Sequence, residues 1–204
     1  MKAWEIKKKL EDHKPGIIEV DRASAVMIPL VETEDGLSLL FEKRANGIRQ
    51  GGEVCFPGGR IDPGEKPEQT ALREMEEELG LPPHRVALLG QFDTLHNYTG
   101  VTIHTFVGQI AQEDLSGIVL QESEVAQVFL VPLKFFLDHK PYIYDFQVLA
   151  DIKEDFPYHM VDSPHKYDWI KGRCNVPIWN YGEHSIWGLT ARIVVHFLKT
   201  FCEL

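Results

Sequence analysis

The sequence is short of cysteine and of long apolar runs, and these two shortages exclude several classes of protein. Its three cysteines, Cys55, Cys174 and Cys202, lie far apart and form no C-x-x-C pair. They therefore predict neither a disulfide framework nor a zinc ribbon, and a reducing compartment is the simplest setting for them. The longest apolar stretches, such as residues 193–198, which His196 interrupts, are too short to cross a bilayer.

Basic residues are also outnumbered by acidic ones. The chain has 21 Lys and Arg against 31 Asp and Glu, which gives a net charge of −10 and a pI near 5.3. This balance argues against a nucleic-acid backbone as the main partner. Residues 1–16 carry charges throughout and lack the apolar core of a secretory signal. We therefore expect a cytoplasmic protein without a membrane or nucleic-acid partner.

Nothing in the sequence divides the chain into parts. Its 204 residues suffice for one sizeable core, and we find no internal repeat, low-complexity segment or linker. The prediction is a single domain over residues 1–204 that begins with a short helix within residues 1–16. Strands are expected at residues 23–29, 37–42, 86–92 and 101–108, a hairpin from residues 144–146 and 168–176, and a last helix from Ile186 to about Phe201.

The most informative stretch is residues 59–81, GRIDPGEKPEQTALREMEEELGL, a glycine-containing loop that runs into a predicted helix. Pro67 suits a first helical position, and Gly80 before two prolines suits a helix end. Lys66 is a poor N-cap, so the start is less well defined than the end. Helical spacing places four apolar residues on one face: Ala71, Leu72, Met75 and Leu79.

The same helix carries three carboxylates on a second face. Glu74, Glu77 and Glu78 have i, i+3 and i+4 spacing, so they repel one another on an isolated helix. A divalent cation would offset that repulsion and turn the face into a binding site. The alternative for a glutamate run of this kind is an ordinary solvated face.

The spacing around these glutamates resembles the Nudix box, G-x5-E-x7-R-E-U-x-E-E-x-G-U with U apolar, at every specified position. The chain therefore looks like a Nudix hydrolase. The resemblance implies an α/β fold, the Nudix α/β/α sandwich with a mixed sheet. It also implies hydrolysis of a nucleoside diphosphate linked to another group, with Mg²⁺ or Mn²⁺ as cofactor.

The resemblance also assigns roles within the box. Glu74 and Glu78 match the most regular metal ligands of the family and Glu77 matches a third, while the carbonyl of Gly59 is expected near the metal. Magnesium prefers a few carboxylates together with waters and phosphates, which agrees with this assignment. Two further members of the catalytic set, Arg73 and Glu65, match positions that brace the ligands, and Arg73 lies four residues before Glu77.

The glycine-rich stretch before the box, residues 43–59, contains three basic residues that are candidates for binding substrate phosphates: Lys43, Arg44 and Arg49. Solvated surface charges are the alternative. The stretch resembles the upstream motif of Nudix coenzyme A diphosphatases at Leu40, Arg44, Ala45, Arg49, Gly52 and residues 56–59. It departs from that motif at Phe41 and at Glu42, which replaces a threonine, and it is one residue shorter. The resemblance implies coenzyme A or acyl-CoA as substrate, with ADP-ribose or another nucleotide derivative as the alternative.

Downstream of the box, residues 121–133 resemble a Nudix segment in which an acidic loop residue joins the metal site or acts as base. Glu124 is the first candidate and Glu122 the second, and a solvated loop glutamate is the alternative. The family also makes a homodimer an expectation. A rival from another class is a Nudix module that binds nucleotides without turnover, and the complete set of box carboxylates argues against it.

Overall fold

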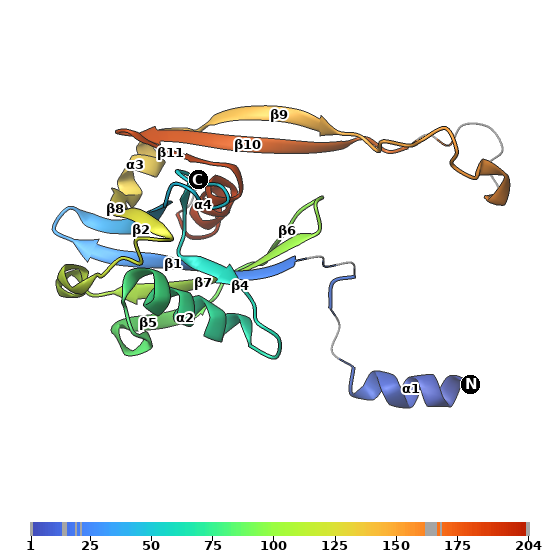
Figure 1. Cartoon of the computed structure of the whole chain (residues 1–204), viewed down its shortest axis with the longest axis horizontal. Helices are drawn as coiled ribbons and strands as arrows, with labels where there is room; N and C mark the ends of the chain where they lie inside the picture. Colours follow the sequence, from blue (N-terminus) through green and yellow to red (C-terminus); the bar gives the residue numbers. More distant parts are fainter. Residues whose placement is uncertain are drawn as a thin grey trace.

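The computed structural model describes residues 2–13, 16–18, 20, 22–161, 167 and 169–202. Its main feature is a central sheet of eight strands (Figure 1). These strands are β1 (Arg22–Thr33), β2 (Gly36–Arg44), β3 (Val54–Cys55), β4 (Gly58–Arg60), β5 (Val86–Gln91), β6 (Leu95–His96), β7 (Val101–Ile110) and β8 (Val125–Pro132).

The central sheet is mixed, as the Nudix resemblance predicted. Its main path runs β3-β2-β1-β7-β5, and β8, β4 and β6 pair with β2, β1 and β7. The β1–β7 pair is parallel, whereas β1 and β2 form an antiparallel hairpin that turns between Thr33 and Gly36. All four strands expected from the sequence are present in this sheet, within a few residues of their predicted bounds.

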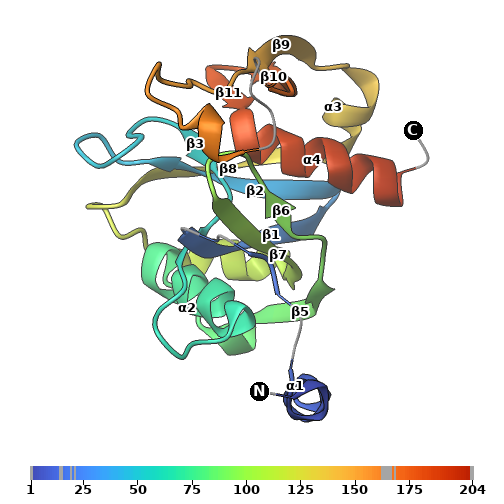
Figure 2. The ribbon, with the colours of Figure 1, turned by 90° about the vertical axis from the view of Figure 1, so that its right-hand side faces the viewer.

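Helices cover both faces of the central sheet (Figure 2). On one face lies α2 (Pro67–Leu79), and on the other lies α4 (Gly188–Phe201). Strand alternation divides the apolar side chains between two cores. Leu40 of β2 packs with Met75 and Leu79 of α2, whereas its neighbour Phe41 packs with Val194 of α4.

A second, three-stranded sheet lies over α4 (Figure 1). It consists of β9 (Tyr142–Val148), β10 (Gly172–Tyr181) and β11 (His184–Trp187), and it follows the short helix α3 (Leu133–Asp138). The predicted hairpin is therefore present as β9 and β10, although Asp168 of the predicted range lies outside the described residues. The hairpin extends beyond the edge of the central sheet.

The prediction that the last helix opens at Ile186 was wrong by two residues. Ile186 and Trp187 end strand β11, where buried and exposed side chains alternate. The helix begins only at Gly188, whose φ of 65° turns the chain between strand and helix. This left-handed conformation is accessible to glycine at little cost, which explains the boundary.

The predicted N-terminal helix is present as α1 (Ala3–Glu11), and none of its residues is buried. It lies apart from the two sheets in the views of Figures 1 and 2. In the described part of the chain, no helix has the length and apolar content needed to cross a membrane.

Candidate active site

Helix α2 forms the base of the site and has the limits expected from the sequence. Pro67 occupies its first turn, and Gly80 ends it with a φ of 66°. Lys66 makes no side-chain cap, and the Gln69 side chain instead accepts a hydrogen bond from the Lys66 N–H at 3.0 Å. Burial of Met75 and Leu79 fixes the rotation of the helix, so Glu74 and Glu78 face the neighbouring strand β4.

Two glycines of β4 let the backbone approach these carboxylates closely. The Gly58 N–H donates a hydrogen bond to Oε2 of Glu78 at 2.8 Å. At Gly59, an added Cβ would lie only 2.2 Å from Oε1 of Glu74, so any side chain there would collide with the carboxylate. Strand β4 itself is held by pairing with β1, where Gly58 lies opposite Val26.

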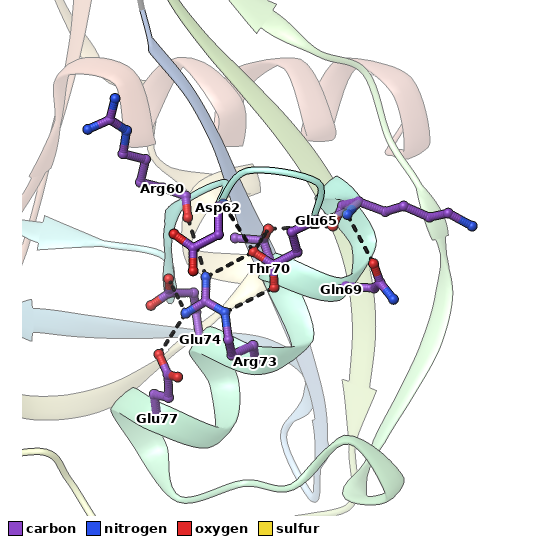
Figure 3. Close-up of polar contacts among 9 residues, drawn as sticks. Arg60, Asp62, Glu65, Gln69, Thr70, Arg73, Glu74 and Glu77 are labelled. Carbon is purple, nitrogen blue, oxygen red and sulfur yellow. Dashed lines mark hydrogen bonds and ion pairs between the residues drawn. The ribbon is translucent and has the colours of Figure 1, made fainter.

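Arg73 braces the box through several oxygens at once (Figure 3). Its Nε donates to Glu65 at 3.0 Å, while its Nη1 lies 2.7 Å from Glu77 and 2.8 Å from Glu74. Thr70 also donates to Glu65 at 2.7 Å. The Arg73 and Thr70 hydrogen bonds lower the pKa of Glu65 to about 2. Charge-assisted hydrogen bonds of this kind hold side chains in one geometry, as the bracing role requires.

The carboxylates beside this network are unusual because they are buried. Glu74 is 9% exposed, Glu78 2% and Glu42 of β2 0%. Burial, reinforced by the adjacent Glu42, raises the pKa of Glu78 to about 9. Burial likewise raises the pKa of Glu42 to about 7 and raises that of Glu74 in spite of Arg73. The site therefore concentrates carboxyl groups where water solvates their charged form poorly, which favours the protonated form when no cation is bound.

A cavity of about 550 Å³ opens over these carboxylates. Six of the residues singled out from the sequence line it: Arg44, Arg49, Gly59, Glu74, Glu78 and Glu124. The other predicted residues do not line it: Lys43, Glu65, Arg73, Glu77 and Glu122. The Glu77 side chain is 58% exposed and pairs with Arg73. Of the basic cluster, only the two arginines thus line the cavity.

The cavity also contains residues that the sequence argument did not assign to substrate binding. Arg60, the residue after Gly59, adds a third arginine to the lining. Trp187 and Leu189, at the junction of β11 and α4, provide an apolar wall. The position of Arg60 within the box, directly after Gly59, was a signal in the sequence. Trp187, in contrast, reaches the cavity because the chain reverses between β10 and β11, which residue spacing does not reveal.

The arrangement suits a divalent cation that keeps water and substrate oxygens among its ligands. Glu74 and Glu78 supply the hard oxygen donors that Mg²⁺ and Mn²⁺ prefer. Within the described ranges, no three His, Cys, Asp or Glu side chains form a complete metal-binding group. Mg²⁺ does not need one, since it is commonly held by one or two carboxylates plus phosphates.

The raised pKa values predict how the stability of the metal-free protein depends on pH. Unfolding returns Glu42 and Glu78 to ordinary carboxyl pKa values near 4.5, so above that pH the folded state binds more protons than the unfolded state. The free energy of unfolding should therefore fall as the pH rises from about 5 to 9. Urea unfolding in EDTA measures this. In Glu78→Gln the free energy of unfolding should change less with pH than in the wild type, whereas Glu76→Gln should behave like the wild type. The same change with pH in the wild type and both variants would contradict the prediction.

Comparisons with known proteins identify the family to which the chain belongs. The model of the NUDIX domain family matches residues 21–152. Nudix hydrolase 3 of Caenorhabditis elegans is 38% identical over 118 residues, covering 56% of this chain and 49% of that protein. An uncharacterized Nudix hydrolase NudL of Photorhabdus laumondii is 33% identical over 177 residues. The match covers 85% of this chain and 82% of that protein.

A third relative is the peroxisomal coenzyme A diphosphatase NUDT7 of Mus musculus, which is 34% identical over 145 residues. The match covers 66% of this chain and 56% of that protein. This chain therefore spans about half the length of the mouse and C. elegans relatives and most of the length of the bacterial one. The family match over most of the chain confirms what the box predicted: the protein belongs to the Nudix family of hydrolases, which act on phosphoric anhydride bonds.

Proposed function

We propose that this chain hydrolyses the diphosphate bond of coenzyme A or an acyl-CoA. One observation carries the proposal: a single cavity brings the buried box carboxylates Glu74 and Glu78 together with Arg44, Arg49 and Arg60. Carboxylates suit a metal that contacts the diphosphate, and arginines suit phosphate oxygens. The products are phosphopantetheine, acylated for an acyl-CoA, and adenosine 3′,5′-bisphosphate, with one water consumed per bond cleaved.

Two further features support coenzyme A as substrate. The mouse relative bears the name of a coenzyme A diphosphatase, and the segment before the box resembles the motif of that subgroup. Within this segment, Arg44 and Arg49 line the cavity. A third phosphate distinguishes coenzyme A from most dinucleotides, so a cavity with several arginines suits it.

The residues around the cavity then have separate tasks. Glu74 and Glu78 would hold Mg²⁺ or Mn²⁺, and the Gly58 N–H keeps one oxygen of Glu78 in place. When bound, such a cation would offset charge on the diphosphate and lower the pKa of a nearby water. Glu124 lines the same cavity and acts electrostatically on Glu74, so it is our candidate base for the attacking water. Arg73 and Glu65 keep the box rigid.

The test is a hydrolysis panel with Mg²⁺ or Mn²⁺, in which the products are identified by mass. It contains CoA, acetyl-CoA, dephospho-CoA, ADP-ribose, NADH, a diadenosine polyphosphate and dNTPs. We expect CoA or acetyl-CoA to give the highest kcat/KM and dephospho-CoA to be slower by about 10-fold or more, since a lost charged hydrogen bond has that effect. A preference for ADP-ribose would reject the CoA assignment, and binding without turnover would identify a non-catalytic module.

Arg49→Ala tests the predicted phosphate contact directly. It should raise KM for CoA about 10-fold while leaving dephospho-CoA little changed, so the discrimination between them is lost. Lys134→Ala removes an exposed cation that pairs with Asp138 on α3, outside the cavity, and serves as the matched control. If Arg49→Ala raised KM equally for CoA and dephospho-CoA, Arg49 would not contact the 3′-phosphate.

Three expectations from the sequence stay predictions under this proposal. They are the single-domain organisation over residues 1–204, the homodimer and the cytoplasmic location.

A further inference from the structure

Trp187 differs from the other tryptophan of the second sheet in having a free ring. Trp179 of β10 is 3% exposed, packs its ring against Phe136 and donates from Nε1 to the His139 carbonyl oxygen at 2.7 Å. Trp187 is 43% exposed, and among the described residues no aromatic ring pairs with it and its Nε1 makes no hydrogen bond. Packing of the fold therefore explains Trp179 but not Trp187.

The strand and the turn that follows it direct Trp187 to the cavity. Ile186 is fully buried, so alternation along β11 places Trp187 on the other face, where it lines the cavity. Oγ1 of Thr190 donates to the Val54 carbonyl oxygen at 3.3 Å, and β11 packs against β3. These contacts join the first turn of α4 to β3, so Trp187 stands on regular elements and not on a mobile loop.

The ring of Trp187 suits a different part of the substrate from the arginines of the same cavity. Guanidinium groups bind phosphate oxygens, whereas an indole face offers dispersion and stacking to another flat ring. Of the two aromatic residues that line the cavity in the described part of the chain, Phe56 is only 3% exposed. In a coenzyme A or ADP-ribose molecule the flat ring is adenine, since neither the ribose nor the pantetheine arm has a π face.

Two polar side chains beside this wall suit the edge of an adenine ring. Gln50 and Glu53 both line the cavity, and Nε2 of Gln50 donates to Oε2 of Glu53 at 3.1 Å. Glu53 directly precedes β3, the strand against which β11 packs. Adenine presents an amino donor and ring-nitrogen acceptors, which a carboxylate and an amide can bind. The Glu53 carboxylate would repel a phosphate, so this part of the cavity favours the base.

We propose that Trp187 is a specificity residue that stacks on the adenine ring of the substrate, with Glu53 and Gln50 at the edge of the ring. The inference rests on the proposed function to the extent that the substrate is an adenine nucleotide. It does not depend on the 3′-phosphate, so it applies to coenzyme A and to ADP-ribose alike. It gives the junction of β11 and α4 a part in substrate selection.

Trp187→Ala and Trp187→Phe test the proposal by ligand binding, without turnover. AMP carries the adenine ring and ribose 5-phosphate lacks it, so the two ligands separate stacking from phosphate contacts. In calorimetry, the affinity for AMP should fall about 10- to 100-fold in Trp187→Ala and should be largely retained in Trp187→Phe. The affinity for ribose 5-phosphate should not change in either variant. AMP should also quench the tryptophan fluorescence of the wild type, and most of this quenching should be absent in Trp187→Phe.

The control is Trp4→Ala, which removes an exposed tryptophan of α1 outside the cavity and should bind AMP like the wild type. Equal losses of AMP and ribose 5-phosphate affinity in Trp187→Ala would overturn the proposal, because Trp187 would then only shape the cavity. Unchanged AMP affinity with weaker binding of phosphopantetheine would overturn it too, as would a wild-type protein that binds AMP no better than ribose 5-phosphate. A substrate panel led by ADP-ribose would reject the CoA function and not this inference.

Discussion

Glu78→Gln is expected to reduce hydrolysis of the preferred substrate by about 1000-fold or more. Changes to residues that only orient metal ligands cost 10- to 100-fold, so the loss of a ligand itself should cost more. In the substituted site, the amide oxygen still accepts from the Gly58 N–H, which leaves an NH₂ group facing the cavity. A hydrogen-bond donor and a metal ion exclude one another at that position.

The loss should not come from unfolding. Glu78 is 2% exposed and its pKa is raised by burial, so the folded protein tolerates a neutral group there. The melting temperature of Glu78→Gln in EDTA should therefore equal or exceed that of the wild type at neutral pH. Glu76 lies two residues from Glu78, on the opposite and exposed face of α2, so Glu76→Gln is the matched control for activity. Turnover of Glu78→Gln within 10-fold of wild type would remove Glu78 from the metal site.

Gly58→Ala is expected to destabilise the fold by about 3 kcal/mol or more. Gly58 has a φ of 154°, and an added Cβ would lie 2.3 Å from the Ala25 carbonyl oxygen and 2.6 Å from Cα of Val26. Both atoms are backbone of the central strand β1, which cannot move aside without disrupting the sheet. Denaturant unfolding measures the loss, and Gly117→Ala, where an added Cβ meets nothing within 4 Å, should change stability by less than about 0.5 kcal/mol.

The neighbouring glycine should behave differently. At Gly59 the three atoms nearest an added Cβ all belong to the Glu74 carboxylate. Gly59→Ala should therefore push this side chain away, which reduces metal binding and turnover while the sheet stays folded. If Gly58→Ala and Gly59→Ala lost stability equally, the two glycines would both be structural and the close approach at Gly59 would have no special role in the site.

The local parts of this site could be predicted from the sequence because they depend on neighbours along one helix. The span of α2, its buried apolar face and the contact from Arg73 to Glu77 all follow from helical periodicity and spacing. The strands could also be predicted from the sequence, because the alternation of apolar and polar residues and the residues of a hairpin turn are short-range signals.

Features that depend on distant segments were harder to predict. Lys43 and Arg44 are adjacent in the sequence, yet only Arg44 lines the cavity, because consecutive residues of β2 point to opposite faces. The burial of Glu42 depends on β3 and β8 lying on either side of β2. The start of α4 was misplaced because IWGLTA is compatible with a helix, and the φ of Gly188 is a property of the folded chain.

The parallel pairing of β1 with β7 also has a consequence for how the protein folds. These strands begin at residues 22 and 101, so the whole Nudix box lies in the long loop that this pairing closes. Closing a loop of that length costs entropy before the contacts are made, and sheets built on such pairings form slowly, on the millisecond to second scale. Helix α2 packs against β1 and β7, so we expect its carboxylates to become buried only after this closure. Metal ions should then bind late in refolding and slow unfolding more than they speed folding.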